Sequence, residues 1–155
     1  MKLGTLCYIE KDNQYLMLHR IKKENDMHKG LWVGLGGKFE PGESPEDCVI
    51  REVYEESGLT IKNPKLRGIL TFPSFSFVEE DWYVFLFVAV DFTGEIKPCD
   101  EGELHWIDKD ELDNLPMYEG DRYFLKWIQE YEGVFSAKYN YDGYTLKDYQ
   151  LVSYG

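Results

Sequence analysis

The chain has 155 residues, of which 43% are hydrophobic and 16% aromatic, enough for one domain with a continuous core. Its 29 acidic and 17 basic side chains give a formal net charge of -12. Such a surface repels a nucleic-acid polymer, because polymer binding depends on Lys and Arg side chains that release counterions. We therefore expect no stable nucleic-acid binding, whereas a small anionic ligand accompanied by cations is compatible with this charge.

The cysteines indicate a reducing compartment. Cys7, Cys48 and Cys99 are odd in number and widely spaced, with no CxxC pair of the kind found in zinc or redox sites. The first residues lack the long apolar segment of a signal peptide, and the longest apolar run, WYVFLFVAV, is too short to cross a bilayer. We expect reduced thiols and a cytoplasmic protein with a single domain over residues 1–155.

Short apolar runs predict the strands. In chain order they cover residues 3–9, 15–19, 31–35, 66–71 and 82–92. The last run is apolar on both alternating faces, which predicts a central strand covered on both sides. Near the end of the chain, Asp142-Gly143 lies between alternating residues and predicts a β-hairpin.

Two segments carry helix signals. The first begins at SPED, where Ser44 can cap the helix, Pro45 suits the first helical position and Asp47 favours the positive end. The second lies within residues 119–131, where an apolar stripe is formed by Tyr123, Phe124, Trp127 and Ile128. Strands interleaved with a few helices predict an α/β or α+β fold, with a mixed sheet between helices.

Three glutamates crowd the C-terminal turns of the first predicted helix: Glu52, Glu55 and Glu56. Each costs about 0.3–1 kcal/mol there, because this end of a helix carries partial negative charge. Spacings of three and four residues place them on neighbouring parts of one face. Clustered oxygen donors suit Mg²⁺ or Mn²⁺, whose charge would reverse the repulsion. The alternative is a solvated acidic face in which Arg51 pairs with Glu55.

The segment before this helix is suited to binding an anion. Three glycines permit close backbone approach of a ligand or metal: Gly34, Gly36 and Gly37. Lys38 follows directly and offers a point charge for a phosphate oxygen. After the glutamates, Gly58 stands where a left-handed residue would end the helix. The order is therefore strand, glycine-rich loop, and helix with clustered glutamates.

This stretch resembles the Nudix box. All of its specified positions are matched, by Gly37, Glu43, Arg51, Glu52, Val53, Glu55, Glu56, Gly58 and Leu59. A pattern of this length is far more specific than a lone glycine motif. The resemblance implies a Nudix α/β/α sandwich with a central mixed β-sheet. It also implies a Mg²⁺-dependent hydrolase, with Mn²⁺ as a possible substitute, that acts on a phosphoanhydride bond.

The same resemblance implies roles for single residues. The three clustered glutamates would be catalytic groups and metal ligands, with the carbonyl of Gly36 as a further ligand. Glu43 would be structural, holding Arg51 and fixing the loop against the helix. A further acidic group is expected from a distant loop, and spacing ahead of Trp106 favours Glu101 in CDEGELHW as ligand or base. A plain acidic surface loop is the alternative for that segment.

The resemblance extends beyond the box. The segments KGLWVGLGGK, MYEGDRYF and FSAKYNYDGYTLKDYQL resemble MutT-type enzymes that clear oxidised purine nucleoside triphosphates, particularly the mammalian form. This implies a base pocket lined by Trp32, Tyr118 and Asp121. Aromatic faces stack on any base, whereas a carboxyl group can read a purine edge. Core packing is the alternative for the two aromatic residues.

Two positions depart from that subfamily. Val33 stands in place of a base-reading asparagine, and Gly120 replaces one of two adjacent aspartates. Valine offers no hydrogen bond, and discrimination between bases depends on such polar contacts. For the phosphates, the expected contacts are Arg20 and Lys38, with Gly37 allowing the ligand to approach.

The expected function is therefore hydrolysis of nucleoside triphosphates, such as 8-oxo-dGTP, to monophosphate and pyrophosphate. One alternative within the enzyme class is another nucleoside diphosphate derivative such as ADP-ribose. A different class is a nucleotide-sensing module without catalysis, which the intact glutamate set argues against. Trimming of RNA 5′ ends is disfavoured by the net charge of -12. A monomer and a homodimer both remain open, since the C-terminal hairpin either completes the sheet or forms an interface.

Overall fold

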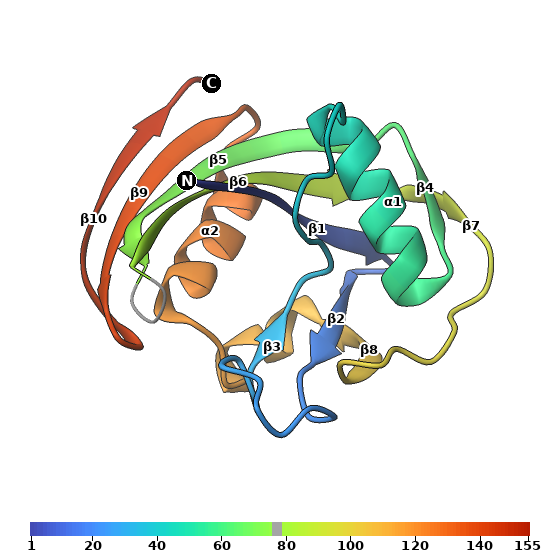
Figure 1. Ribbon diagram of the computed structural model, residues 1–155. Helices are drawn as coiled ribbons and strands as arrows, with labels where there is room; N and C mark the ends of the chain where they lie inside the picture. The colour runs from blue at the N-terminus through green and yellow to red at the C-terminus, as the bar shows by residue number, and fades with distance from the viewer. Residues whose placement is uncertain (76–78) are drawn as a thin grey trace.

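A mixed sheet forms the centre of the computed structural model, which describes residues 1–75 and 79–155 (Figure 1). Within these residues eight strands form the sheet: β1 (Lys2–Lys11), β2 (Gln14–His19), β3 (Trp32–Val33), β5 (Lys65–Phe75), β6 (Glu80–Ala89), β8 (Glu103–Asp108), β9 (Phe135–Asp142) and β10 (Thr145–Ser153). The strand order is β10-β9-β5-β6-β1-β2-β3, and β8 pairs with β2. Two short strands, β4 (Thr60–Lys62) and β7 (Asp91–Thr93), pair separately.

Parallel and antiparallel pairs alternate from β10 to β2, and the pairs of β2 with β3 and β8 are antiparallel. Strand β1 runs parallel to β6 and antiparallel to β2, while β5 runs antiparallel to β6 and parallel to β9. The parallel pairing of β1 with β6 joins segments about eighty residues apart, with Cys7 opposite Phe87. The predicted mixed sheet is therefore confirmed.

Three features of the sheet differ from the sequence prediction. The strand expected over 31–35 is only two residues long, because the chain leaves β2 after Val33, and Leu35 instead bridges to Cys7. The apolar run 82–92 is divided between β6 and β7. Strand β8 was not predicted, since its acidic flanks resemble a loop. Its alternating side chains nevertheless pack inward, Leu104 and Trp106 on one face and Ile107 on the other.

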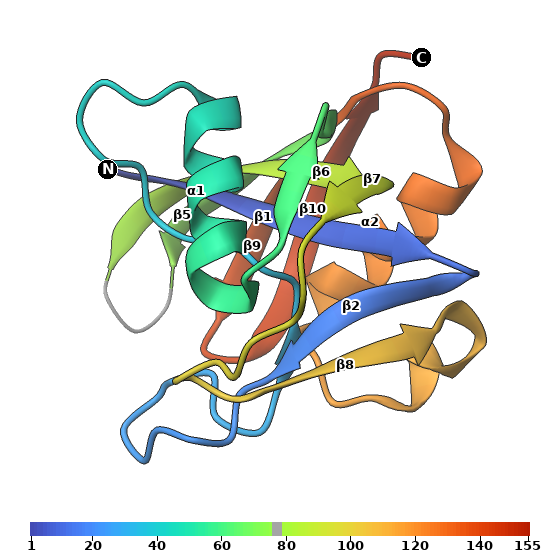
Figure 2. The same ribbon diagram turned by 90° about the vertical axis from the view of Figure 1, so that its right-hand side faces the viewer.

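Two helices cover opposite faces of the sheet (Figures 1 and 2). Helix α1 (Pro45–Ser57) packs against Cys7 and Ile9 of β1, whereas α2 (Glu119–Glu130) belongs to the cluster that contains Tyr8. Successive residues of β1 thus enter two different cores, as expected for a strand covered on both sides. The arrangement confirms the α/β/α sandwich. The described residues contain no helix with the length and apolarity that a membrane span requires.

The ends of α1 follow from its sequence. The Ser44 hydroxyl accepts a hydrogen bond from the Asp47 amide at 3.0 Å, and the Asp47 carboxylate accepts one from the Ser44 amide at 3.1 Å. This capping box is worth about 1 kcal/mol. Gly58 ends the helix in the left-handed conformation, with φ of 82° and its amide bonded to the Tyr54 carbonyl at 2.8 Å. The predicted start and stop are confirmed.

The remaining elements of the second half are also close to prediction. Helix α2 buries Phe124, Trp127 and Ile128 against the sheet. Strands β9 and β10 form the predicted hairpin, which turns at Gly143 with φ of 63°. Between β8 and α2 the chain forms η1 (Lys109–Asn114), a 3₁₀ helix.

Candidate active site

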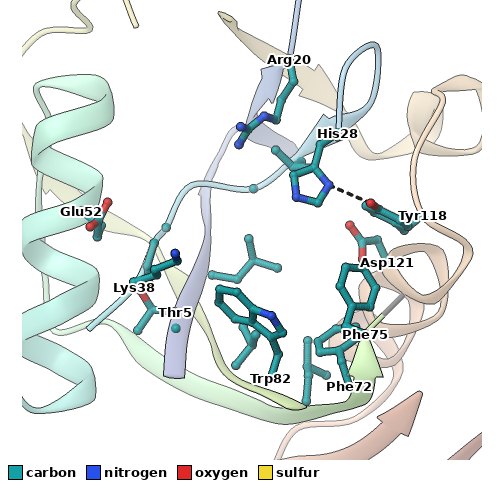
Figure 3. Close-up of a pocket in the computed structure, with 18 of the residues that line it drawn as sticks. Thr5, Arg20, His28, Lys38, Glu52, Phe72, Phe75, Trp82, Tyr118 and Asp121 are labelled. Atoms are coloured by element: carbon teal, nitrogen blue, oxygen red, sulfur yellow. Dashed lines mark hydrogen bonds between the residues drawn. The ribbon is translucent and has the colours of Figure 1, made fainter. Parts of the chain in front are cut away.

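A cavity of about 570 Å³ lies between α1 and the start of α2, over the floor made by β1, β5 and β6 (Figure 3). Its acidic end is lined by Glu52, Glu56 and Glu101. Its aromatic end is lined by Phe72, Phe75, Trp82, Tyr118 and Tyr141, together with Asp121. Figure 3 shows Glu52 on α1 at one side of the cavity and Tyr118 and Asp121 at the other, with Trp82 between them. The sequence places these residues far apart, and the fold brings them to one cavity.

The glycine loop brings the backbone close to the helix carboxylates. The amide of Gly36 donates a hydrogen bond of 2.7 Å to Oε1 of Glu56. A Cβ on Gly36 would lie 2.0 Å from the Thr5 carbonyl oxygen, and one on Gly37 would lie 2.4 Å from the Glu52 carboxylate. At Gly36 the clash would be with backbone atoms, so this position needs glycine, whereas at Gly37 the end of the Glu52 side chain would have to move.

An ion pair fixes the loop against α1. Nε and Nη2 of Arg51 donate to the two carboxylate oxygens of Glu43 at 2.6 and 2.8 Å. Nη2 also donates to the carbonyl of Lys38 at 3.0 Å, and Nη1 donates to Glu52 at 2.8 Å. The hydrogen bonds from Arg51, together with the Glu40 amide, lower the pKa of Glu43 to about 2. This is the contact that the resemblance implied for Glu43 and Arg51.

The three clustered glutamates do not share one environment. Glu52 and Glu56 line the cavity, whereas Glu55 is outside the lining, its side chain is 55% exposed, and it pairs with Arg51 at 3.2 Å. On a helix, residues four apart differ by only about 40° around the axis, while neighbouring residues differ by about 100°. Glu52 and Glu55 are neighbours, since both accept from Nη1 of Arg51, but only Glu52 and Glu56 line the cavity, and a metal-ligand role for Glu55 stays a prediction.

Glu101 completes the acidic end from a distant loop. One oxygen each of Glu56 and Glu101, and the sulfur of Cys99, lie within 4.8 Å of one another. Burial, together with the nearby carboxylates of Glu101 and Glu52, raises the pKa of Glu56 to about 8 in spite of the hydrogen bond from the Gly36 amide. Clustered oxygen donors whose charges repel one another fit a divalent cation. Asp100 and Glu103, the neighbours considered with Glu101, do not line the cavity.

Two basic side chains line the cavity beside these carboxylates. Nε of Arg20 pairs with Asp26 at 2.6 Å, and its Nη1 lies 3.4 Å from Glu101. The ammonium nitrogen of Lys38 lies 5.6 Å from the ring centroid of Trp82, between the two ends of the cavity. Both cationic side chains are thus close to the phosphates of a ligand that would extend from the aromatic end to the acidic end of the cavity.

Asp121 is the buried carboxyl group of the aromatic end. Burial raises its pKa to about 7, so that near neutral pH it exists in both protonation states and can donate or accept a hydrogen bond. Nearby, Tyr118 and the imidazole of His28 share a hydrogen bond of 2.7 Å. Val33 also lines the cavity and leaves that wall apolar, as its departure from the asparagine predicts.

The structure corrects the expected position of Trp32. Its ring is not in the cavity lining; it stacks on His19 with centroids 4.3 Å apart and planes 5° apart. Successive side chains of a strand point to opposite faces: Trp32 packs against the cluster that contains Tyr8, and Val33, which lines the cavity, packs against the cluster beneath α1. The aromatic floor comes instead from Trp82 on β6. Its alternation with Val84 along the strand places both side chains on the same face, which is a pattern that the sequence contains. No local pattern pointed to His28.

The other departure, Gly120, has a steric reason. Its amide donates a hydrogen bond of 2.7 Å to the Tyr141 hydroxyl, and a Cβ at this position would lie 2.6 Å from the same oxygen. Its carbonyl accepts a hydrogen bond of 2.7 Å from the Tyr139 hydroxyl. The two tyrosines of β9 therefore occupy the space that an aspartate side chain would need.

The NUDIX domain family model matches residues 2–128, which include every residue of this cavity except Tyr141. The chain belongs to the Nudix hydrolase family. It is 35% identical to a Nudix hydrolase of Bacillus subtilis, YvcI, over 97% of this chain and 90% of that protein. The crystal structure of a MutT protein from Bacillus halodurans superposes with a TM-score of 0.87 at 34% identity, covering 97% of both chains.

Two further relatives carry names that specify a substrate. The chain is 34% identical to the oxidized purine nucleoside triphosphate hydrolase of Danio rerio, over 77% of this chain and 74% of that protein. It is 35% identical to the ADP-ribose pyrophosphatase of Methanocaldococcus jannaschii, over 79% and 68%. This Nudix hydrolase is thus an enzyme that acts on phosphoanhydride bonds, in a family that generally uses divalent metal ions.

Proposed function

We propose that this Nudix hydrolase cleaves purine nucleoside triphosphates to monophosphate and pyrophosphate with Mg²⁺, and that oxidised purine deoxynucleotides such as 8-oxo-dGTP are preferred. The observation that carries this proposal is the cavity itself. One continuous space has clustered carboxylates at one end and five aromatic side chains with a buried carboxyl group at the other. The first end suits a metal-bound polyphosphate, and the second suits a base.

The acidic end would hold the metal. Glu52, Glu56 and Glu101 are the side chains placed to bind it, and the Gly36 carbonyl is a further donor from the glycine loop. Glu55, at the rim, could join them only after it leaves Arg51. A bound divalent cation neutralises phosphate charge and lowers the pKa of bound water. One oxygen of Glu56 and one of Glu101 lie within 4.8 Å of each other, and we assign proton acceptance from the attacking water to this pair.

The remaining residues bind and orient the nucleotide. Lys38 and Arg20 would neutralise phosphate oxygens, and Gly37 would leave room for them. Trp82 and Tyr118 would flank the base, while Asp121 would hydrogen-bond its edge. Because the pKa of Asp121 is near 7, its carboxyl group can present a donor or an acceptor to an altered purine edge. Retention of a carboxyl group in this apolar site supports base reading.

A second substrate class is favoured by specific observations. Val33 offers no hydrogen bond to a base, and Gly120 removes one of two expected carboxylates. The chain is also as similar to the Methanocaldococcus jannaschii ADP-ribose pyrophosphatase as to the Danio rerio enzyme. ADP-ribose or another nucleoside diphosphate derivative is therefore the competing candidate. A nucleotide sensor without catalysis is less well supported, because the carboxylates at the acidic end are retained.

Initial rates with Mg²⁺ across 8-oxo-dGTP, 2-hydroxy-dATP, dGTP and ADP-ribose, with identification of the products, test the proposal. We expect kcat/KM for an oxidised purine to exceed that for dGTP by about 10²-fold or more, as polar recognition allows, with release of pyrophosphate. Release of ribose 5-phosphate from ADP-ribose at the highest rate would replace this substrate class with the second one. No hydrolysis of any of the four would contradict the proposed substrate class.

A matched pair of variants tests the acidic end. Glu56→Gln should lower turnover by about 10²–10⁴-fold, the range for loss of a general base, without loss of fold. Glu46→Gln changes an exposed glutamate on the same helix and should leave turnover unchanged. Equal rates in the two variants would contradict the assignment.

We also propose that the enzyme acts in the cytoplasm. Its three buried cysteines are free thiols, which supports a reducing compartment.

A further inference from the structure

The third donor beside Glu56 and Glu101 is a sulfur atom. Cys99 lies in the loop before β8, only 6% exposed, with a free thiol. Its sulfur and one oxygen of each glutamate lie within 4.8 Å of one another, in the range that small side-chain movements close around one ion. The three donors come from two separate segments, the end of α1 and the loop of residues 99–101.

Basic side chains hold this loop in place from one side. Nζ of Lys22 donates a hydrogen bond of 2.8 Å to the Cys99 carbonyl, and the Lys22 amide donates one of 3.3 Å to the Glu101 carbonyl. The carboxylate of Glu101 lies 3.4 Å from Nη1 of Arg20 and 3.8 Å from Nζ of Lys23. The backbone of the loop is thereby fixed, with thiol and carboxylate both facing Glu56. Three cationic side chains therefore hold the loop, and a metal ion bound here would share Glu101 with Arg20 and Lys23.

The other cysteines have surroundings that packing explains. The sulfur of Cys48 lies 3.4 Å from the Thr5 hydroxyl and 3.6 Å from the Gly37 carbonyl. Cys7 is fully buried in the core beneath α1. Neither belongs to a group of three possible metal donors among the described residues. Cys99 differs from both, because its sulfur lies beside two carboxylates as well as the backbone amides of Glu101 and Gly102.

We propose that Cys99, Glu56 and Glu101 form a mixed thiolate and carboxylate site for thiophilic divalent cations such as Zn²⁺ and Co²⁺. This inference rests on the proposed function, because Glu56 and Glu101 also serve the Mg²⁺ site. Mg²⁺ prefers oxygen donors in octahedral geometry, whereas Zn²⁺ accepts one sulfur and two oxygens with a tetrahedral preference. On binding, the thiol gives its proton to solvent and its sulfur binds the cation. Zn²⁺ should therefore compete with Mg²⁺ and inhibit hydrolysis.

Cobalt provides a readout that does not depend on activity. Co²⁺ is titrated into the full chain, into Cys99→Ser and into Cys48→Ser, and the near-ultraviolet spectrum is recorded. We expect a sulfur-to-cobalt charge-transfer band in the wild type and in Cys48→Ser, and its loss in Cys99→Ser. The Zn²⁺ affinity of Cys99→Ser, measured by competition with Co²⁺ or a dye, should fall at least about tenfold, the loss typical even of outer-shell partners.

A double variant, Cys7→Ala with Cys48→Ala, leaves Cys99 as the one cysteine and keeps the test valid if Cys99→Ser fails to fold. The band must persist in it. Absence of the band from the wild type, or its persistence in folded Cys99→Ser, would overturn the inference. Hydrolysis with Mg²⁺ alone is measured on the same preparations. Mg²⁺-dependent turnover without a cobalt band refutes the thiolate site only, whereas a band without any turnover refutes the proposed function only.

Discussion

The carboxylate of Glu43 and the guanidinium of Arg51 meet through two hydrogen bonds, 2.6 and 2.8 Å long, across the gap between the glycine loop and α1. Arg51 also reaches the Lys38 carbonyl and Glu52. One side chain therefore joins the loop, its structural partner and a carboxylate at the acidic end.

Glu43→Gln should lower both stability and activity. The folded-state pKa of Glu43 is about 2, below its usual 4.5, so its ionised form is favoured by folding. That stability is present above pH 4.5 and is lost as the pH falls through 2. The melting temperature of Glu43→Gln should lie below that of the wild type at pH 7, and the two should converge near pH 2. Hydrolysis should fall about 10- to 100-fold, as for other outer-shell partners. Equal melting temperatures of Glu43→Gln and the wild type at pH 7 would contradict this prediction. The control is Glu46→Gln, which should melt like the wild type.

Gly37→Ala tests the close approach of the loop to Glu52. The new methyl group would lie 2.4 Å from the carboxylate, so Glu52 must move. A displacement of about 1 Å in a catalytic group costs about 10²-fold in rate, and we expect a loss of kcat of that size with a melting temperature near that of the wild type. Gly42→Ala is the control for kcat: no atom lies within 4 Å of its added carbon, but its φ of 81° means that backbone strain should lower its melting temperature while kcat stays unchanged. Wild-type kcat in Gly37→Ala would show that Glu52 does not need this position.

Lys38→Met tests the phosphate contact. The ammonium groups of Lys38 and Lys97 each lie over an aromatic ring, 5.6 Å from the Trp82 centroid and 5.4 Å from the Tyr54 centroid. Only Lys38 lines the cavity. Loss of a charged hydrogen bond to a phosphate should raise KM about 10- to 100-fold, while Lys97→Met should leave KM unchanged. Parallel effects of the two substitutions would indicate a role in packing alone.

Asp121→Asn should change the dependence of stability on pH. The folded-state pKa of Asp121 is about 7, above its usual 3.8, so between these values the folded protein keeps a proton that the unfolded chain has lost. Stability therefore decreases as the pH rises through this window, by at most about 1.4 kcal/mol per pH unit. Asn cannot ionise, so the variant should melt near the wild type at pH 4 and above it at pH 8. The raised pKa of Glu56 acts in the same direction in both proteins and cancels in the difference.

The control for this measurement is Asp110→Asn, which changes an exposed aspartate and should follow the wild type at both pH values. An Asp121→Asn curve parallel to the wild type from pH 4 to pH 8 would contradict the raised pKa. The same variant, in the substrate assay, should alter the preference between oxidised and normal purines if Asp121 reads the base.

Local sequence patterns predict the features that are stabilised by contacts between neighbouring residues. Ser44 and Asp47 form the capping box because both groups lie within one turn, and Gly58 adopts the left-handed conformation because it has no Cβ. The β9–β10 hairpin likewise follows from a turn at Gly143 between alternating residues. Strand β8 was missed for the opposite reason, since its place is decided by pairing with β2 rather than by its own composition.

The family, the capped helix and the clustered glutamates can all be predicted from the order of residues, because spacing along a helix and turn chemistry are properties of neighbouring residues. Which side chains meet depends instead on the tertiary structure. In the folded chain Val33 lines the cavity, whereas Trp32 and Glu55 lie outside its lining. The tertiary structure also places Cys99 beside Glu56 and fills the space at Gly120 with tyrosines. These outcomes depend on strand pairing and on packing between segments far apart in the chain, which no local pattern records.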